Sequence, residues 1–192
     1  MEFDGIVYFD FACPHVWRFW KMLVAAGERG AKVSVEWRPF SLEARNDESG
    51  LEPIWEDPER SHGGLHALAA YEWVRANAPD RQAVFLGAVL HARHEQKAKL
   101  GDWDMLQQAA DASGIDGAAL VAAVRDRGEG YAAVGAAFEE ARGYEVGGTP
   151  TVFRWGPPLS VGMLDVPGNP LERLRTIDAM LRDDGLWSLR KP

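Results

Sequence analysis

The residues best suited to chemistry are a cysteine and a histidine separated by a single proline, in the segment Cys13-Pro14-His15. This segment follows a short run of β-branched and aromatic residues at 6–11, which predicts a strand. Proline fits the first turn of a helix, so we expect Cys13 between the strand end and a helix start. Free N–H groups and the helix dipole favour an anion there, and the Cys13 thiolate should therefore form readily.

His15 is expected to support this thiol. As an imidazolium it could stabilise the thiolate, or it could deliver a proton to a leaving group. The pair therefore predicts a nucleophilic site. One alternative stays open, because a free cysteine is often a small, inert core residue beside which His15 would be an ordinary surface residue.

A second candidate is the segment Gly148-Thr149-Pro150-Thr151, which lies directly before a predicted strand. A cis bond before Pro150 would leave the Thr149 backbone extended and unpaired, so that a peptide or thiol ligand could pair with it. Only about 5% of X-Pro bonds are cis, so local chemistry alone favours an ordinary trans turn.

The first part of the chain predicts a β-α-β unit that would position Cys13. Helix-compatible residues 17–26 follow the first strand and end at Gly27 and Gly30. Apolar and polar residues then alternate over 33–37, which predicts a second strand with one buried face. A crossover of this kind is right-handed and makes the two strands parallel, so an α/β core is expected.

The middle of the chain predicts helices only. Residues 43–57 are acidic and proline-containing, which indicates a surface connection. Helical spacing follows in three apolar stripes: Phe85, Ala88, Val89 and Ala92; Met105, Leu106 and Ala109 between a cap at Asp102 or Asp104 and an end at Gly114; and Leu120, Val121 and Val124 after a cap at Asp116. These segments predict an inserted helical bundle.

The last third of the chain returns to mixed structure. An apolar stripe before Gly143 predicts a helix, residues 151–153 and 159–163 predict a hairpin, and Asn169-Pro170 predicts the start of a final helix that ends at Gly185. The two stripes are Tyr131, Val134, Phe138, Ala141 and Leu171, Leu174, Ile177, Leu181. The predicted domains are residues 1–42 with 130–192, and an inserted helical domain over 43–129.

Composition narrows the classes of function. The chain has 192 residues with 29 acidic and 21 basic side chains, a formal charge of −8, which argues against nucleic-acid binding and against an anionic membrane surface. The N-terminal residues lack a signal-peptide pattern, and no apolar run is long enough to cross a bilayer. Cys13 is the only cysteine, so an internal disulfide is excluded and the cytoplasm is the expected location.

The remaining histidines and tryptophans admit two interpretations each. His62 and His66 are four residues apart and His91 and His94 three apart, spacings that suit a metal site, but we expect surface residues on polar helix faces and no metal. Trp17 could line a substrate cleft, as could Trp103, although core packing is the more frequent role of tryptophan. The acidic residues 43–59 suit a solvated loop or a lid over such a cleft.

Two segments carry a resemblance to a known family. Residues Asp10-Phe11-Ala12-Cys13-Pro14-His15-Val16 resemble the active-site turn of DsbA-type thioredoxin-fold proteins, and Gly148-Thr149-Pro150-Thr151-Val152 resemble their cis-proline loop. The helical insertion and the glycine-rich approach to Thr149 are most similar to the cytoplasmic FrnE-like branch, which also resembles mycothiol-dependent nitroreductases. The resemblance implies an α/β, thioredoxin-like fold interrupted by an all-helical insertion. It also implies that Cys13 is the attacking thiol and that Pro150 packs beside it and orients the substrate. Together with Pro14, Thr149 and Trp17, Pro150 makes up the expected substrate-binding residues.

The chain departs from this family at Val16, where the second, resolving cysteine of a Cys-x-x-Cys motif would stand. A dithiol cycle is therefore excluded, and an external thiol such as glutathione or mycothiol must resolve the mixed disulfide. Kappa-class glutathione transferases and hydroxychromene-carboxylate isomerases also lack the second cysteine, but they have serine where Cys13 stands.

We therefore expect a monothiol oxidoreductase of the DsbA/FrnE type that acts through Cys13 and His15 on a disulfide or an electrophile. A low-molecular-weight thiol would be its cosubstrate, with no tightly bound cofactor and no metal. Two alternatives remain, a glutathione- or mycothiol-dependent transferase or isomerase of the kappa type, and a non-catalytic binding module. A homodimer is left open.

Overall fold

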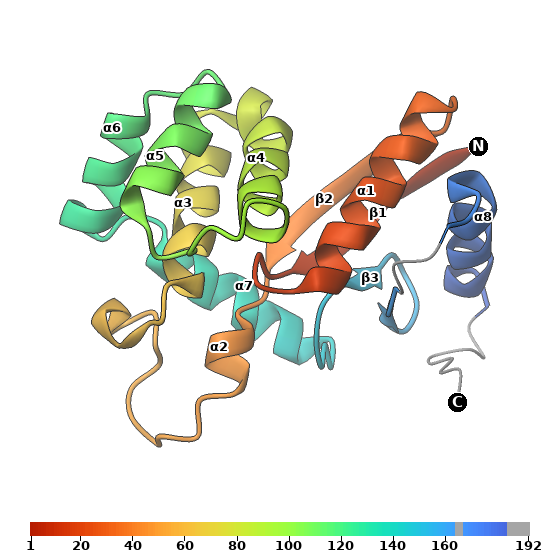
Figure 1. The fold of residues 1–192 in the computed structure, drawn as a ribbon. Coiled ribbons are helices and arrows are strands. Elements are labelled where there is room, and N and C mark those ends of the chain that lie inside the picture. The colour runs from red at the N-terminus through yellow and green to blue at the C-terminus, as the bar shows by residue number, and fades with distance from the viewer. Residues whose placement is uncertain (164–166, 184–192) are drawn as a thin grey trace. The chain divides into compact units, whose positions relative to one another are not determined.

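The computed structural model describes residues 1–163 and 167–183, which form two compact units by their internal contacts. The first unit comprises Met1–Phe9, Cys13–Phe40 and the described residues from Glu140 onward. The second unit comprises Asp10–Ala12 and Ser41–Glu139. Figure 1 shows the strands in the first unit and a group of helices in the second.

The first unit is built on a sheet in which the described strands have the order β2-β1-β3-β4. The strands are β1 (Glu2–Phe9), β2 (Lys32–Pro39), β3 (Thr151–Phe153) and β4 (Leu159–Ser160). β1 and β2 are parallel and joined by α1 (Pro14–Glu28), which confirms the predicted β-α-β unit. β3 runs antiparallel to β1 and pairs with β4 as the predicted hairpin, although β4 ends at Ser160 rather than near residue 163.

Helices α1 and α8 (Pro170–Leu181) share one apolar core with this sheet. The core combines strand and helix side chains, among them Phe3, Val7, Phe19, Met22, Val152, Leu174 and Ile177. Asn169 caps α8 by accepting from the Leu171 N–H, and Pro170 occupies the first turn, as predicted. The predicted end at Gly185 lies outside the described residues.

The second unit is helical, which confirms the predicted insertion. Its helices are α2 (Leu42–Arg45), α3 (Gly64–Asn77), α4 (Gln82–His94), α5 (Trp103–Ala112), α6 (Gly117–Val121) and most of α7 (Tyr131–Gly143). Short 3-10 turns η1 (Pro58–Arg60) and η2 (Pro79–Arg81) and the π-helical segment η3 (Ala122–Asp126) connect them. Asp102 rather than Asp104 caps α5, and Asp116 caps α6.

The units divide the chain at other places than the predicted domain ends after residues 42 and 129. The second unit extends to Glu139, because residues Tyr131–Glu139 of α7, about two and a half turns, pack within it. The Tyr131 hydroxyl lies 2.8 Å from Nδ1 of His66, and the Phe138 ring lies 5.3 Å from that of Trp55. The predicted strand over residues 6–11 also ends early, since β1 stops at Phe9 and Asp10–Ala12 belong to the second unit.

The connection predicted over residues 43–57 starts inside a short helix. Ser41 caps α2 by accepting from the Ala44 N–H, and Glu43 lies in the first turn of that helix. Within the described residues, no helix is long and apolar enough to cross a membrane.

Candidate functional site

Cys13 is the residue that caps α1, in the place that the sequence predicts. Its backbone is extended, with φ −80° and ψ 117°, and Pro14 follows in the first turn. The Val16 N–H donates to the Cys13 carbonyl oxygen over 3.1 Å, whereas the His15 N–H has no acceptor among the described residues. Since Pro14 has no N–H, this free donor and the helix dipole are what the backbone offers to a negative charge at Cys13.

The Cys13 thiol lies against the second candidate segment. Its Sγ is 3.1 Å from the Thr149 carbonyl oxygen, to which it donates, and the Thr149–Pro150 peptide bond is cis. The loop is held from both sides, because the Thr151 hydroxyl donates to Gly148 O over 2.8 Å and the Val161 N–H to Pro150 O over 2.9 Å. Residues far apart in sequence thus form one site within the first unit.

Burial and unpaired polar atoms describe how this site can react. Cys13 is only 6% exposed and is therefore a buried residue. The backbone of Thr149, which we expected to be unpaired, is unpaired only at its N–H, which has no partner among the described residues. Its carbonyl oxygen accepts a hydrogen bond from the Cys13 thiol. The Thr149 hydroxyl is also buried without a partner in the part of the chain that is described. The Thr149 N–H thus remains as a donor for a ligand, whereas the hydroxyl is enclosed by the protein.

Formation of a mixed disulfide at Cys13 would remove the S–H proton that is donated to the Thr149 carbonyl oxygen. That oxygen would then be able to accept from the backbone of an extended ligand.

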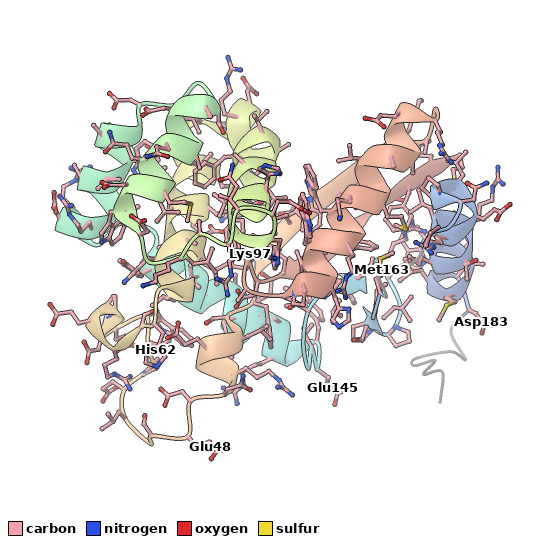
Figure 2. All side chains as sticks on the ribbon, in the orientation of Figure 1. Glu48, His62, Lys97, Glu145, Met163 and Asp183 are labelled. Atoms are coloured by element: carbon pink, nitrogen blue, oxygen red, sulfur yellow. The ribbon has the colours of Figure 1, made fainter. Side chains whose placement is uncertain are left out.

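His15 is anchored by its ring to the backbone of Met163, which Figure 2 labels. Nδ1 lies 2.8 Å from the Met163 oxygen and 3.1 Å from the Met163 nitrogen, so either tautomer has a partner. Arg18 donates to the same carbonyl oxygen over 2.9 Å. Nε2 has no partner among the described residues and is the ring atom that could exchange a proton. Sequence reasoning missed Met163 because a backbone carbonyl leaves no signal in residue type.

Trp17 and Pro14 are the other residues predicted to contact substrate. Pro14 is exposed at the start of α1, whereas Trp17 is 8% exposed. The Trp17 ring stacks on Trp20 with 5.3 Å between centroids, and the Lys21 ammonium lies 4.9 Å from its centroid. The packing role that tryptophan usually plays is therefore present, and contact with substrate stays a prediction.

Asp10, the first residue of the predicted active-site segment, organises the turn before Cys13. One carboxylate oxygen accepts from Ala12 N over 2.8 Å and the other from Leu42 N over 2.7 Å. Burial raises the pKa of this carboxyl, and the two N–H groups offset part of the shift. Asp10 belongs to the predicted active-site segment but had no role assigned to it, although an acid three residues before the cysteine is visible in the sequence.

The histidines with metal-like spacing are not all surface residues, which corrects the sequence-based expectation. His62 and His91 are exposed, but His66 and His94 are partly buried and hydrogen-bonded. His66 stacks on Trp103 with 5.0 Å between ring centroids, and Nε2 of His94 lies 2.8 Å from Phe11 O. No group of three or more potential ligands is arranged for a metal ion in residues 1–163 and 167–183.

The burial of His66 predicts a pH dependence of stability. Burial lowers the pKa of His66 below 6.5, with a smaller opposing effect of Glu43, so the unfolded chain binds a proton more readily than the folded one. Neutral, buried His66 therefore makes its full contribution to the free energy of unfolding above pH 6.5. That contribution is lost as the pH falls toward the lower pKa of His66 in the folded chain. In urea unfolding, His66→Phe should lose less stability than the wild type between about pH 7.5 and pH 5.

A His91→Gln variant is the control for this measurement, because His91 is exposed. It should follow the wild-type pH profile. Burial also lowers the pKa of His94, and the pH dependence that His94 contributes is the same in both variants. Equal pH profiles for the wild type and His66→Phe would contradict the prediction.

Comparison with known protein families identifies the family, and comparison with solved structures identifies the fold. The sequence profile of the DSBA-like thioredoxin domain matches residues 6–170. No curated protein matches the chain. The thiol-disulfide exchange protein alpha-DsbA2 from Wolbachia pipientis has a TM-score of 0.63 and 19% identity, over 93% of this chain and 81% of that one.

Two further solved structures are similar. The oxidoreductase NmDsbA1 from N. meningitidis has a TM-score of 0.58 and 20% identity, over 95% of this chain and 83% of that one. Proteus mirabilis ScsC in a compact conformation has a TM-score of 0.61 and 16% identity, over 93% and 81%. At these identities the likeness shows the fold, and the predicted thioredoxin-like α/β fold with a helical insertion is confirmed. Since the family profile covers most of its length, the chain belongs to the DSBA-like thioredoxin domain family.

Proposed function

We propose that the protein carries out thiol-disulfide exchange by a monothiol mechanism, with Cys13 as the nucleophile and a low-molecular-weight thiol as the external reductant. The observation that carries this proposal is the position of the Cys13 sulfur, at the start of α1 and 3.1 Å from the carbonyl that precedes Pro150. A thiol at this place has a helix start on one side and the unpaired N–H of Thr149 close by.

The cycle has two exchange steps, and sulfur and electrons balance in each. The Cys13 thiolate attacks a substrate disulfide, forms a bond to one sulfur and releases the other as a thiolate, which takes up a proton. An external thiolate then attacks the mixed disulfide, restores the Cys13 thiolate and leaves as a new disulfide. After these two steps one substrate sulfur is a thiol and the other is in a disulfide with the external thiol. Attack of a second thiol molecule on that disulfide completes the two-electron reduction of the substrate and leaves the two thiol molecules joined as their own disulfide.

The residues around Cys13 support these steps. Nε2 of His15 can supply the proton that the leaving thiolate takes up. The N–H of Thr149 can donate to a ligand with an extended backbone, and Pro14 is exposed next to Cys13.

The need for an external thiol follows from the single cysteine of the chain. Val16 occupies the position of a resolving cysteine, and the chain contains no other thiol than Cys13. Glutathione or mycothiol is abundant only in reducing compartments, and a lone thiol also fits the cytoplasm better than an export route. The FrnE-like branch is the part of the family that this proposal favours, because of the helical insertion and the glycine-rich approach to Thr149.

The test is to trap the intermediate. Incubation with oxidised glutathione should add one glutathionyl group per chain at Cys13, and reduced glutathione should remove it. Intact-mass measurement follows the adduct, peptide mapping locates it, and denatured protein shows how much burial slows its formation. A folded protein that forms no adduct while the denatured chain does would show that Cys13 is an inert core residue.

A further inference from the structure

Strand β2 leaves one side of its backbone open. It ends the described sheet, so β1 is its neighbour on one side only. The Phe40 N–H donates to Phe9 O in β1 over 2.8 Å, and with the parallel register this shows that the even-numbered residues of β2 bond toward β1. The N–H and C=O groups of Val33 and Val35 therefore point away from β1, where they have no partner among the described residues.

The side chains of β2 form two rows beside this open backbone. Val33 and Val35 are half-buried and pack against the core that α1 and α8 share with the sheet. Lys32 and Glu36 are exposed on the other face. Within the described residues the Lys32 ammonium has no partner, and Glu36 binds Arg38 over 2.6 Å through Oε1 but keeps Oε2 free. The polar row thus offers one spare cation and one spare acceptor.

Helix α1 adds apolar surface next to β2. Arg18 donates to the backbone of Met163, which follows β4, so this side of α1 is directed toward the β4 end of the sheet. Trp20 and Val24 are four residues apart and lie on the other side of the helix, toward β2. Val24 is 41% exposed and Trp20 is half-buried. Apolar side chains beside an open strand are a surface of the kind that protein interfaces cover.

A second copy of β2 fits this open side in one register. Two antiparallel copies that place Val33 opposite Val35 exchange four backbone hydrogen bonds about a two-fold axis. The same register places Lys32 of each copy opposite Glu36 of the other, and opposite charges in such positions stabilise a pair of strands. With Val35 opposite its own copy, Lys32 would instead meet Arg38, a like-charge pair that is destabilising.

The same charges disfavour an arbitrary strand as the partner. Open strands are commonly protected from pairing by lysine or proline, and β2 carries Lys32 at its start and Pro39 at its end. Pro39 lies outside the segment that would pair through the two valines. Lys32 repels or strands its charge against most sequences, whereas Glu36 of a second β2 neutralises it. The strand is therefore better matched to a copy of itself than to an unrelated segment.

We propose that the protein forms a homodimer in which two β2 strands pair antiparallel, with each Val33 opposite Val35 of the second copy. The two sheets then form one continuous sheet. Because a two-fold axis perpendicular to this sheet keeps both α1 helices on the same face, Trp20 and Val24 of the two copies lie on either side of the junction. The dimer does not depend on the thiol chemistry of Cys13.

Sedimentation equilibrium of the full chain tests the proposal, with a reductant present so that Cys13 cannot link two chains. We expect the wild type to dimerise. Lys32→Glu and Glu36→Lys should each weaken dimerisation at least about tenfold, because each turns two attractive pairs across the junction into repulsive ones. An equimolar mixture of the two variants should form dimers again, since the introduced charges then face opposite charges.

The matched control is Arg175→Glu, which makes the same charge change as Lys32→Glu at an exposed residue of α8. It should dimerise as the wild type does. Lys32 has no partner within the described residues, so its variant remains informative even if Glu36→Lys, which loses the bond to Arg38, does not fold. The proposal is wrong if the wild type is a monomer at every concentration, if Lys32→Glu dimerises as tightly as Arg175→Glu, or if mixing the two folded variants restores no dimer.

Discussion

Cys13→Ser should lose thiol-disulfide exchange by at least about 10³-fold, because an alcohol cannot form the mixed disulfide through which the reaction proceeds. The assay measures reduction of a glutathionylated peptide by glutathione, with the uncatalysed rate subtracted. The serine hydroxyl can still donate to the Thr149 carbonyl, so the free energy of unfolding should change by no more than about 1 kcal/mol. Activity and stability should therefore separate in this variant.

Cys13→Ala is the companion variant, because it also removes the donor to Thr149 O in a buried place. It should lose activity to the same extent and be less stable than Cys13→Ser. Retention of exchange activity in Cys13→Ser would show that the reaction does not pass through this sulfur.

Features that depend on neighbouring residues were predictable from the sequence. Asp116 and Asn169 are short polar side chains followed by helical apolar spacing, and each caps the helix expected after it. Pro14 likewise marks the start of α1. In these places the partner of the side chain is a backbone N–H two or three residues later, so a local pattern contains the whole interaction.

Features that depend on distant contacts were not predictable in the same way. The extent of the second unit follows from the packing of Phe138 on Trp55, and aromatic spacing alone does not say which partner a helix face meets. Met163 holds the His15 ring through its backbone, which the residue type does not reveal. A cavity of the second unit arises where Gly63 meets Gly101, and neither glycine belongs to a sequence motif.

The contact between Cys13 and Thr149 lies between these cases. The two segments were singled out separately, and only a resemblance to a family joined them before the structure did. The burial of the thiol at 6% exposure was not part of that expectation. Both observations are compatible with one mechanism, in which the buried thiol meets an extended ligand at the Thr149 backbone.

Val16→Cys should convert the site from monothiol to dithiol chemistry. Val16 lies in the first turn of α1, where its N–H donates to the Cys13 carbonyl over 3.1 Å, and residues three apart are neighbours on a helix surface. The introduced thiol is held close to the Cys13 sulfur and should displace glutathione from the mixed disulfide, with an internal disulfide as the product. Without added thiol, the lifetime of the adduct should fall at least about 10³-fold, since attack becomes intramolecular.

We expect Val16→Cys to fold because the substitution is small. Val16 is buried, and the change removes about the volume of one methyl group, which should lower the free energy of unfolding by about 1 kcal/mol. Val24→Cys is the matched control: the same substitution on the same helix, at an exposed position about 12 Å further along the axis, from which the thiol cannot reach Cys13. Its adduct should persist as in the wild type, and mass spectra of both variants at successive times give the comparison directly. If the adduct persists equally in Val16→Cys, a thiol at residue 16 cannot reach the Cys13 sulfur. The dependence on an external thiol would then not result from the valine at this position.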